Sequence, residues 1–194
     1  MMSKQLKWVY LFVLSLIWGS SFILIKKGLI GLTALQLGSL RIIFAAIFLL
    51  LIGFKSLLKI PRAKWKYIAM TSVFGTFLPA YLFAIAETEI DSSTTGILNS
   101  LTPLITLLLG ALAFGILAQR RQILGVFIGL VGSGMIVFSG VVNHPNQNYY
   151  YVLLVVIACF CYALNVNLIK KYLSDLKTLS IATGNFTVLL IPAL

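Results

Sequence analysis

Acidic residues and histidine are scarce in this chain. Only 4 of its 194 residues are Asp or Glu, and His144 is the single histidine, beside Pro145 in a polar loop. A His-based metal site or a Ser-His-Asp triad needs several such groups in one place. Glu87, Glu89 and Asp91 lie in one short turn, which we expect to be solvated. The sequence therefore predicts no metal, no cofactor and no enzyme activity.

Charged residues of either sign are also rare, at 10% of the chain against 60% hydrophobic residues. A soluble domain of this size would carry about 25% charged residues, and the mean hydropathy here is +1.05. The net charge of +11 falls mostly in short loops between apolar segments. No basic patch interleaved with aromatics indicates a nucleic-acid partner. We therefore expect an integral membrane protein whose main partner is the lipid bilayer.

Cysteine is limited to Cys159 and Cys161. On a helix, side chains two positions apart point about 200° away from each other. The two thiols are therefore not expected to form a disulfide or to chelate a metal together. We expect both to be small packing residues.

Six complete apolar segments and the beginning of a seventh predict an all-α polytopic membrane protein. The segments cover residues 8–25, 35–54, 67–86, 91–118, 123–140 and 149–169, and the seventh begins near Thr178. Most basic residues fall on alternate loops, with the largest group in 55–66, whereas Lys26 and Lys27 face the other side. This asymmetry predicts a cytoplasmic N-terminus. Loops this short suit a bacterial cell (plasma) membrane.

An internal repeat is visible in the positions of four consecutive residues. Leu24-Ile25-Lys26-Lys27 recurs without a gap as Leu168-Ile169-Lys170-Lys171. The match equates the first segment with the sixth, so the repeat unit contains five spans, and an odd number places the second copy upside down. We expect residues 1–140 to form a first five-helix repeat. Residues 149–194 would then begin a second, inverted repeat, which is incomplete here.

The fourth segment, 91–118, carries its polar residues on one helical face. They are Ser92, Thr95, Asn99, Thr102 and Thr106. Pro103 lies inside this stripe and leaves a backbone carbonyl without its usual partner. The stripe either lines a polar cavity within the membrane or hydrogen-bonds to neighbouring helices and to its own backbone.

A second group of candidates lies on the first, second and sixth segments. In the repeat, Tyr162 and Asn165 fall opposite Trp18 and Ser21, which predicts a central site between the first and sixth spans. Trp18 either lines that site or packs between helices. Arg41 is costly inside a span. It either anchors a substrate carboxylate or reaches toward headgroups, water or the acidic turn.

The fifth segment contains a ridge of small residues, Gly125, Gly129 and Ser133. A small-xxx-small ridge is typical of a face on which two membrane helices pack closely. We therefore expect a packing face here and not a ligand site.

Several blocks resemble the EamA-type branch of the drug/metabolite transporter superfamily. They are Trp18-Gly19-Ser20-Ser21-Phe22 with Lys26, Leu40-Arg41 with Ala45-Ala46, the run from Pro79 to Ala86, Leu98-Asn99-Ser100-Leu101-Thr102-Pro103, and Gln122-Ile123-Leu124-Gly125 with Gly129 and Gly132. The resemblance covers essentially the whole chain. It implies two inverted five-helix repeats and movement of a small metabolite across the cytoplasmic membrane, with many members resembling amino-acid exporters.

Together these patterns predict a membrane transporter, an exporter of a small metabolite such as an amino acid, that works by alternating access. The predicted substrate-pathway residues are Trp18, Ser21, Arg41, Tyr81, Asn99, Thr102, Pro103, Tyr162 and Asn165. The alternative is a non-transporting truncated remnant or a partner subunit of a helical bundle, because the second repeat is incomplete. The sequence leaves open whether the protein forms a homo-oligomer.

Overall fold

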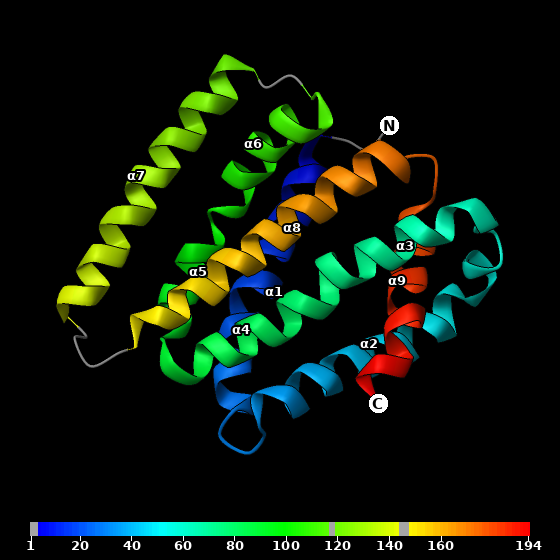
Figure 1. The fold of residues 1–194 in the computed structure, drawn as a ribbon, viewed down its shortest axis with the longest axis horizontal. Coiled ribbons are helices and arrows are strands. Elements are labelled where there is room, and N and C mark those ends of the chain that lie inside the picture. The colour runs from blue at the N-terminus through cyan, green and yellow to red at the C-terminus, as the bar shows by residue number, and fades with distance from the viewer. Residues whose placement is uncertain (1–3, 117–118, 144–147) are drawn as a thin grey trace.

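The structure is a computed structural model that describes residues 4–116, 119–143 and 148–194. These residues form helices and no strand, as the sequence predicts (Figure 1). The α-helices are α1 (Lys4–Gly28), α2 (Ala34–Leu57), α3 (Trp65–Ser72), α4 (Leu78–Glu89), α5 (Ser92–Asn99), α6 (Thr102–Phe114), α7 (Arg120–Asn143), α8 (Val152–Tyr172) and α9 (Thr178–Ala193). Short turns of other helix types are η1 (Arg62–Lys64), η2 (Val73–Phe77) and η3 (Tyr149–Tyr151).

Five helical rods in the described part are long and apolar enough to cross a membrane: 6–28, 34–57, 62–89, 92–114 and 152–172. They correspond to the predicted first, second, third, fourth and sixth segments. The predicted fifth segment is the 24-residue helix α7, and the seventh is the shorter apolar helix α9. The chain is therefore a multi-pass, all-helical membrane protein. The count of six spans and a partial seventh stays a prediction, as does the inverted repeat.

The third rod is one continuous helix with a wide turn in its middle. Between α3 and α4 the five residues of η2 form a π-helical turn, whose last bond joins the Leu78 N–H to the Val73 carbonyl. Pro79 follows directly and has no N–H to offer to a carbonyl one turn earlier. The wide turn accommodates this loss, and such π turns occur frequently at functional sites.

The fourth rod is two helices and not one, which corrects the single helix expected from the sequence. α5 ends at Asn99 and α6 begins at Thr102. The Ser100 and Leu101 N–H groups bond only three residues back, to the carbonyls of Ile97 and Leu98. Pro103 cannot donate to the Asn99 carbonyl, so the α-helical ladder is interrupted at that point. α6 then ends at Phe114, before Gly115 with φ +67°, and residues 117–118 of the predicted segment lie outside the described residues.

α8 crosses the middle of the bundle and packs on α4 and α6 (Figure 1). α2 packs on α4 and most extensively on α9, where Gly53 leaves room for the side chain of Thr183. α9 also packs on α3, with the buried Asn185 amide 2.9 Å from Thr71 Oγ1. α7 lies along the opposite edge and contacts α5 and α6.

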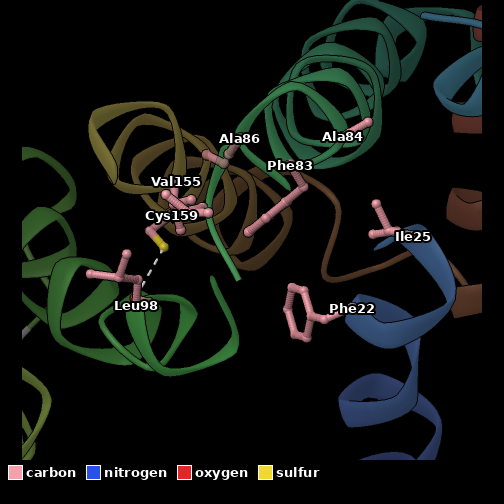
Figure 2. Packing of buried hydrophobic residues seen from close by; sticks show 10 residues of the cluster. Phe22, Ile25, Phe83, Ala84, Ala86, Leu98, Val155 and Cys159 are labelled. Carbon is pink, nitrogen blue, oxygen red and sulfur yellow. Dashed lines mark hydrogen bonds between the residues drawn. The ribbon is translucent and has the colours of Figure 1, made fainter. Parts of the chain in front are cut away.

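The largest hydrophobic core joins α1, α4, α5 and α8 (Figure 2). Phe22 and Phe83 meet edge to face with ring centroids 5.6 Å apart. The Cys159 thiol lies against α5 and donates to the Leu98 carbonyl at 3.5 Å. Both cysteines are free and buried, as the sequence predicts. This core packs the C-terminal turns of α1 against the end of α5.

The glycine ridge of α7 has open space beside Gly125 and Gly129 in the described part of the chain. A Cβ added at Gly125 or Gly129 would meet no atom within 4 Å. The side chain of Ser133 lies outside the described residues. The predicted packing role of the ridge therefore stays a prediction.

Candidate functional site

A cavity of about 430 Å³ lies where the fourth rod is broken. α1, η2, the α5–α6 junction and α8 form its walls. Six of the residues predicted for the substrate pathway line it: Trp18, Asn99, Thr102, Pro103, Tyr162 and Asn165. The structure thus brings residues from the first, fourth and sixth predicted segments to one place.

Both helix irregularities contribute residues to the lining of this cavity. Gly75, in the π turn, lies directly against Asn165 of α8, and a Cβ at Gly75 would come within 2.5 Å of the Asn165 side-chain carbon Cγ. The Oδ1 atom of Asn165 is buried and has no hydrogen-bond partner among the described residues. A buried acceptor without a partner costs about 1–3 kcal/mol. Asn165 therefore contributes to the cavity wall a polar atom whose hydrogen-bonding capacity is unused among the described residues.

The polar stripe of the fourth rod divides into two parts. Some of its residues line the cavity and others hydrogen-bond to their own backbone, so each interpretation from the sequence holds for part of the stripe. Asn99 and Thr102 line the cavity, and the Thr102 hydroxyl donates to Asn99 Oδ1 at 3.2 Å. Thr95 and Thr106 instead donate to carbonyls of their own rod, at 3.1 and 2.7 Å. Ser92, at the start of the stripe, lines the open groove between α1 and α5.

Two aromatic rings form one wall of the cavity. Trp18 of α1 meets Tyr162 of α8 edge to face, with centroids 5.9 Å apart. Behind them lies a smaller cavity of about 150 Å³, whose lining includes Ser21 and Arg41. The Ser21 hydroxyl donates to the Trp18 carbonyl at 2.6 Å. Ser21 and Arg41 therefore belong to a second chamber, separated from the first by the aromatic pair.

An open groove of about 990 Å³ continues from the cavity between α1 and α5. It shares Trp18, Asn99 and Ser100 with the cavity. Gly96 lies beside the Phe22 ring here, and a Cβ at that position would make an ordinary contact with the ring at 3.5 Å. The sequence analysis did not select Gly75, Gly96 or Ser100. The sequence contained one indication for two of them, because Gly75 and Ser100 lie shortly before Pro79 and Pro103, where the regular α-helix is interrupted.

Tyr81 lies apart from these spaces. Its hydroxyl is 2.8 Å from Ser39 Oγ, its ring packs edge-on against Phe77 at 4.9 Å, and a Cβ at Gly38 would come within 2.7 Å of the ring. Tyr81 therefore packs between α2 and α4 and lines none of the cavities described above. Its predicted place in the pathway stays a prediction without a supporting contact.

Asn167 connects helices and does not face the cavity. Its amide nitrogen donates to the Thr106 carbonyl at 3.0 Å and to the Ala163 carbonyl at 2.9 Å. Its oxygen lies 2.9 Å from the position that a Cβ on Gly110 would occupy. The residue therefore holds α6 close to α8.

Glu87 is completely buried, which overturns the expectation of a solvated acidic turn. α4 continues to Glu89, so Glu87 falls on the buried face with Phe83, Ala84 and Ile90. The Ser92 hydroxyl lies 3.2 Å from Glu87 Oε2. This carboxyl therefore belongs to the interior of the bundle, whereas Glu89 is exposed.

Residues 6–138 match the EamA-like transporter family. Over 119 residues the chain is 29% identical to a probable amino-acid metabolite efflux pump of Salmonella typhimurium, covering 60% of this chain and 38% of that protein. It is 25% identical over 188 residues to an uncharacterized transporter of Archaeoglobus fulgidus, covering 94% of this chain and 64% of that protein. No solved structure matches significantly.

The chain thus spans less than two thirds of the length of each of these two curated relatives. The match to the family, in contrast, extends over more than half of the chain, from the first predicted span into the fifth. The chain therefore belongs to the EamA-like transporter family.

Proposed function

We propose that this protein carries a small polar or zwitterionic metabolite, such as an amino acid, through the cavity at the α5–α6 break. The observation that carries the proposal is the buried, unpartnered Asn165 Oδ1 opposite the π turn. Ligand sites are concave and mostly apolar, with a few well-placed polar groups. The cavity has this composition: aromatic and small side chains with the amides of Asn99 and Asn165.

The size and charge of the cavity favour a small neutral ligand. Its volume of about 430 Å³ falls at the small end of ligand pockets, which span about 300–1,000 Å³. Within the described residues, no charged side chain lines it. A ligand with a full net charge would therefore lose its hydration without gaining a counter-charge, whereas a zwitterion has no net charge to compensate.

The broken rod supplies partial charges of both signs. Helix dipoles leave partial positive charge at the start of a helix and partial negative charge at its end. The carbonyl end of α5 at Asn99 and the start of α6 at Thr102 both lie at the cavity. Interrupted helices bind the charged groups of substrates in this way in other secondary transporters. The ammonium of an amino acid would bind near Asn99, and its carboxylate near Thr102.

Alternating access requires an element that moves, and α1 is the best candidate. Its side chains from Leu6 to Gly19 are exposed, and its packing is mainly with α4 and α5. A shift of α1 would separate Trp18 from Tyr162 and connect the main cavity to the chamber of Arg41. Arg41 would then bind the substrate carboxylate on its way through the second chamber.

We place the protein in a bacterial plasma membrane with its N-terminus in the cytoplasm, and we assign export as its direction. The distribution of basic residues supports this orientation. The name of the Salmonella relative supports export of an amino-acid metabolite. In this proposal residues 1–140 form the first repeat and 149–194 begin the inverted second repeat.

Transport by the purified chain in proteoliposomes tests the proposal. Vesicles would be loaded with a mixture of isotope-labelled amino acids, and release would be followed by mass spectrometry. We expect release of at least one compound, and loss of that release in the Asn165→Ala variant. Asn148→Ala is the matched control, because Asn148 is exposed and outside the cavity. Equal transport by both variants would refute the proposed site.

The alternative, a partner subunit or a homo-oligomer, has one supporting observation. Large apolar side chains remain exposed along α1, including Trp8 at 71% and Phe12 at 66%. Lipid or a second helix would cover them equally well. Chemical cross-linking in native membranes distinguishes the two, since a specific cross-linked dimer or heteromer supports the subunit interpretation. A cross-link pattern limited to monomer, with transport present, excludes it.

A further inference from the structure

We propose that Glu87 is a proton-binding site, and that its protonation state decides whether the Ser92 hydroxyl bonds to α1 or to α4. The site lies at the α4–α5 turn, beside the core that holds Phe22 and Ile25 of α1 (Figure 2). It is separate from the metabolite cavity described above. Neither the family nor the relatives' names assign it a role.

The geometry of Ser92 supplies the switch. Its Oγ lies 3.1 Å from the Phe22 carbonyl of α1 and 3.2 Å from Glu87 Oε2 of α4. A serine hydroxyl has one proton to donate and lone pairs to accept. It can therefore donate to only one of these two acceptors at a time. Both contacts are hydrogen bonds at the same time only if Glu87 Oε2 itself carries a proton and donates it to Ser92 Oγ.

The two protonation states of Glu87 select different arrangements. When Glu87 is ionised, Ser92 donates to Oε2, and the Phe22 carbonyl loses this donor. When a proton from solvent binds Oε2, the new O–H donates to Ser92 Oγ, and the Ser92 hydroxyl turns to donate to Phe22. One covalent O–H bond forms at Glu87, and no covalent bond within the protein breaks. Protonation therefore completes a chain from α4 through α5 to α1.

The surroundings permit both states. Glu87 is fully buried, and its Oε1 has no partner in the described part of the chain, which disfavours the ionised form. The positive charges of Lys26 and Arg41 act on the carboxyl in the opposite sense. Lys26 Nζ itself donates to two α4 backbone carbonyls, Glu87 at 2.6 Å and Ile90 at 3.1 Å. Lys26 therefore acts as a nearby cation and not as a paired counter-ion.

Other titratable groups lie on α4 and on the elements that pack against it. They include Glu89 on α4 itself, Asp91 ahead of α5, Tyr151 of η3, and Cys159 and Tyr162 of α8. Glu89 is exposed at the same helix end as Glu87. It is therefore the natural comparison for a carboxylate that titrates in water.

The consequence concerns α1. Most of this helix is exposed, and its outer turns are held by Phe22, by Lys26 and by the Ser92 bond. Removing the Ser92 bond loosens the attachment of α1 to α5 beside the groove. In the transporter proposed above, this site would make the position of α1 depend on pH. That last step alone rests on the proposed function.

Fluorescence of Trp18 against pH tests the site without any substrate. In the full chain with Trp8→Phe and Trp65→Phe, Trp18 is the remaining one of the 3 tryptophans, and its ring contacts Tyr162. We expect a stepwise change in emission with pH. Glu87→Gln should abolish the step and keep the low-pH spectrum, because its amide donates to Ser92 at every pH. Ser92→Ala should abolish the step and keep the high-pH spectrum.

Glu89→Gln is the control and should retain the step. A Glu87→Gln protein that titrates like the parent would overturn the proton site. A Ser92→Ala protein that still titrates, or that keeps the low-pH spectrum, would overturn the switch. Ser92→Ala removes no charge, so it remains informative if Glu87→Gln fails to fold. Transport is not measured, so failure here leaves the metabolite site standing, and the reverse also holds.

Discussion

Replacing Gly75 with alanine directly tests the contact between the π turn and Asn165. The added Cβ would lie 2.5 Å from Asn165 Cγ, 2.6 Å from Nδ2 and 2.7 Å from Oδ1. Ordinary contacts begin near 3.4 Å, so the amide or the turn must move by close to 1 Å. Because the whole amide group is too close, a simple flip of the amide does not relieve the clash.

Two opposing effects set the magnitude. Overpacking a tight site costs about 1–3 kcal/mol, whereas alanine in place of glycine within a helix gains up to about 1 kcal/mol. We therefore expect a net loss of about 0–2 kcal/mol in unfolding free energy. The effect on transport should be larger, because a misplacement of about 1 Å can cost about 100-fold in a positioned site. Transport loss that exceeds the stability loss is the expected signature.

A double-mutant cycle with Asn165→Ala isolates the contact. If the Cβ–amide clash is the cause, the stability costs of the two single variants should not add, with a coupling of about 0.5–3 kcal/mol. Reversible denaturation in detergent, followed by circular dichroism, measures each corner. Gly134→Ala is the control, because a Cβ there meets nothing within 4 Å. Strict additivity between Gly75→Ala and Asn165→Ala would refute the contact.

Three further predictions follow from other contacts. Asn167→Ala should lower stability by about 1–3 kcal/mol, because the Thr106 carbonyl loses its interhelical donor; no change in the unfolding midpoint would contradict this. The Lys64 hydrogen bond lowers the pKa of Asp175 below its ordinary 3.8, so its contribution is present above pH 3.8 and lost as pH falls through the lowered pKa. Asp175→Asn should remove that acid-side loss, and thermal melts at acidic pH would detect it, with a small amplitude because both side chains reach solvent. Gly125→Ala should leave stability equal or slightly raised, whereas a clear loss would mean that the α7 ridge packs on another helix.

The sequence predicted the helices well for a physical reason. In lipid, backbone groups must be satisfied within each segment, so length and apolar content alone decide where the spanning helices lie. The sequence also identified Pro103 as a residue that frees a carbonyl, but it predicted one continuous helix, and the break between α5 and α6 is visible only in the structure. Asn99 and Thr102 were selected from the polar stripe and Asn165 from the repeat, and the structure brings the three to one cavity.

The third rod shows why helical spacing alone does not place Tyr81. The π turn at 73–77 inserts about one extra residue into this rod. One residue rotates the remainder of a helix by about 100°, so the face of α4 cannot be extrapolated from α3. Tyr81 accordingly faces α2 and Ser39. In the sequence, only the position of Pro79 indicated that the face of α4 is rotated relative to that of α3.

Glu87 was missed because its burial depends on a partner distant in sequence. The end of α4 is extended by Lys26 of α1, which donates to the Glu87 and Ile90 carbonyls. Without that contact, three acids within five residues resemble a solvated turn. Phe83, Ala84, Glu87 and Ile90 do share one helical face, which was a local signal. This signal could be used only if one knew that the helix continues past Ala86.

The attachment of α1 connects the two proposals. Its C-terminal third is fixed by the Phe22–Phe83 contact and by Lys26, both directed at α4. Nearer its N-terminus, α1 contributes Trp18 to both cavities and to the groove. In the proposal for Glu87, a change at Ser92 alters the attachment of α1 and thereby the position of Trp18. A proton at Glu87 and a metabolite beside Asn165 would therefore act on the same helix from two different sites.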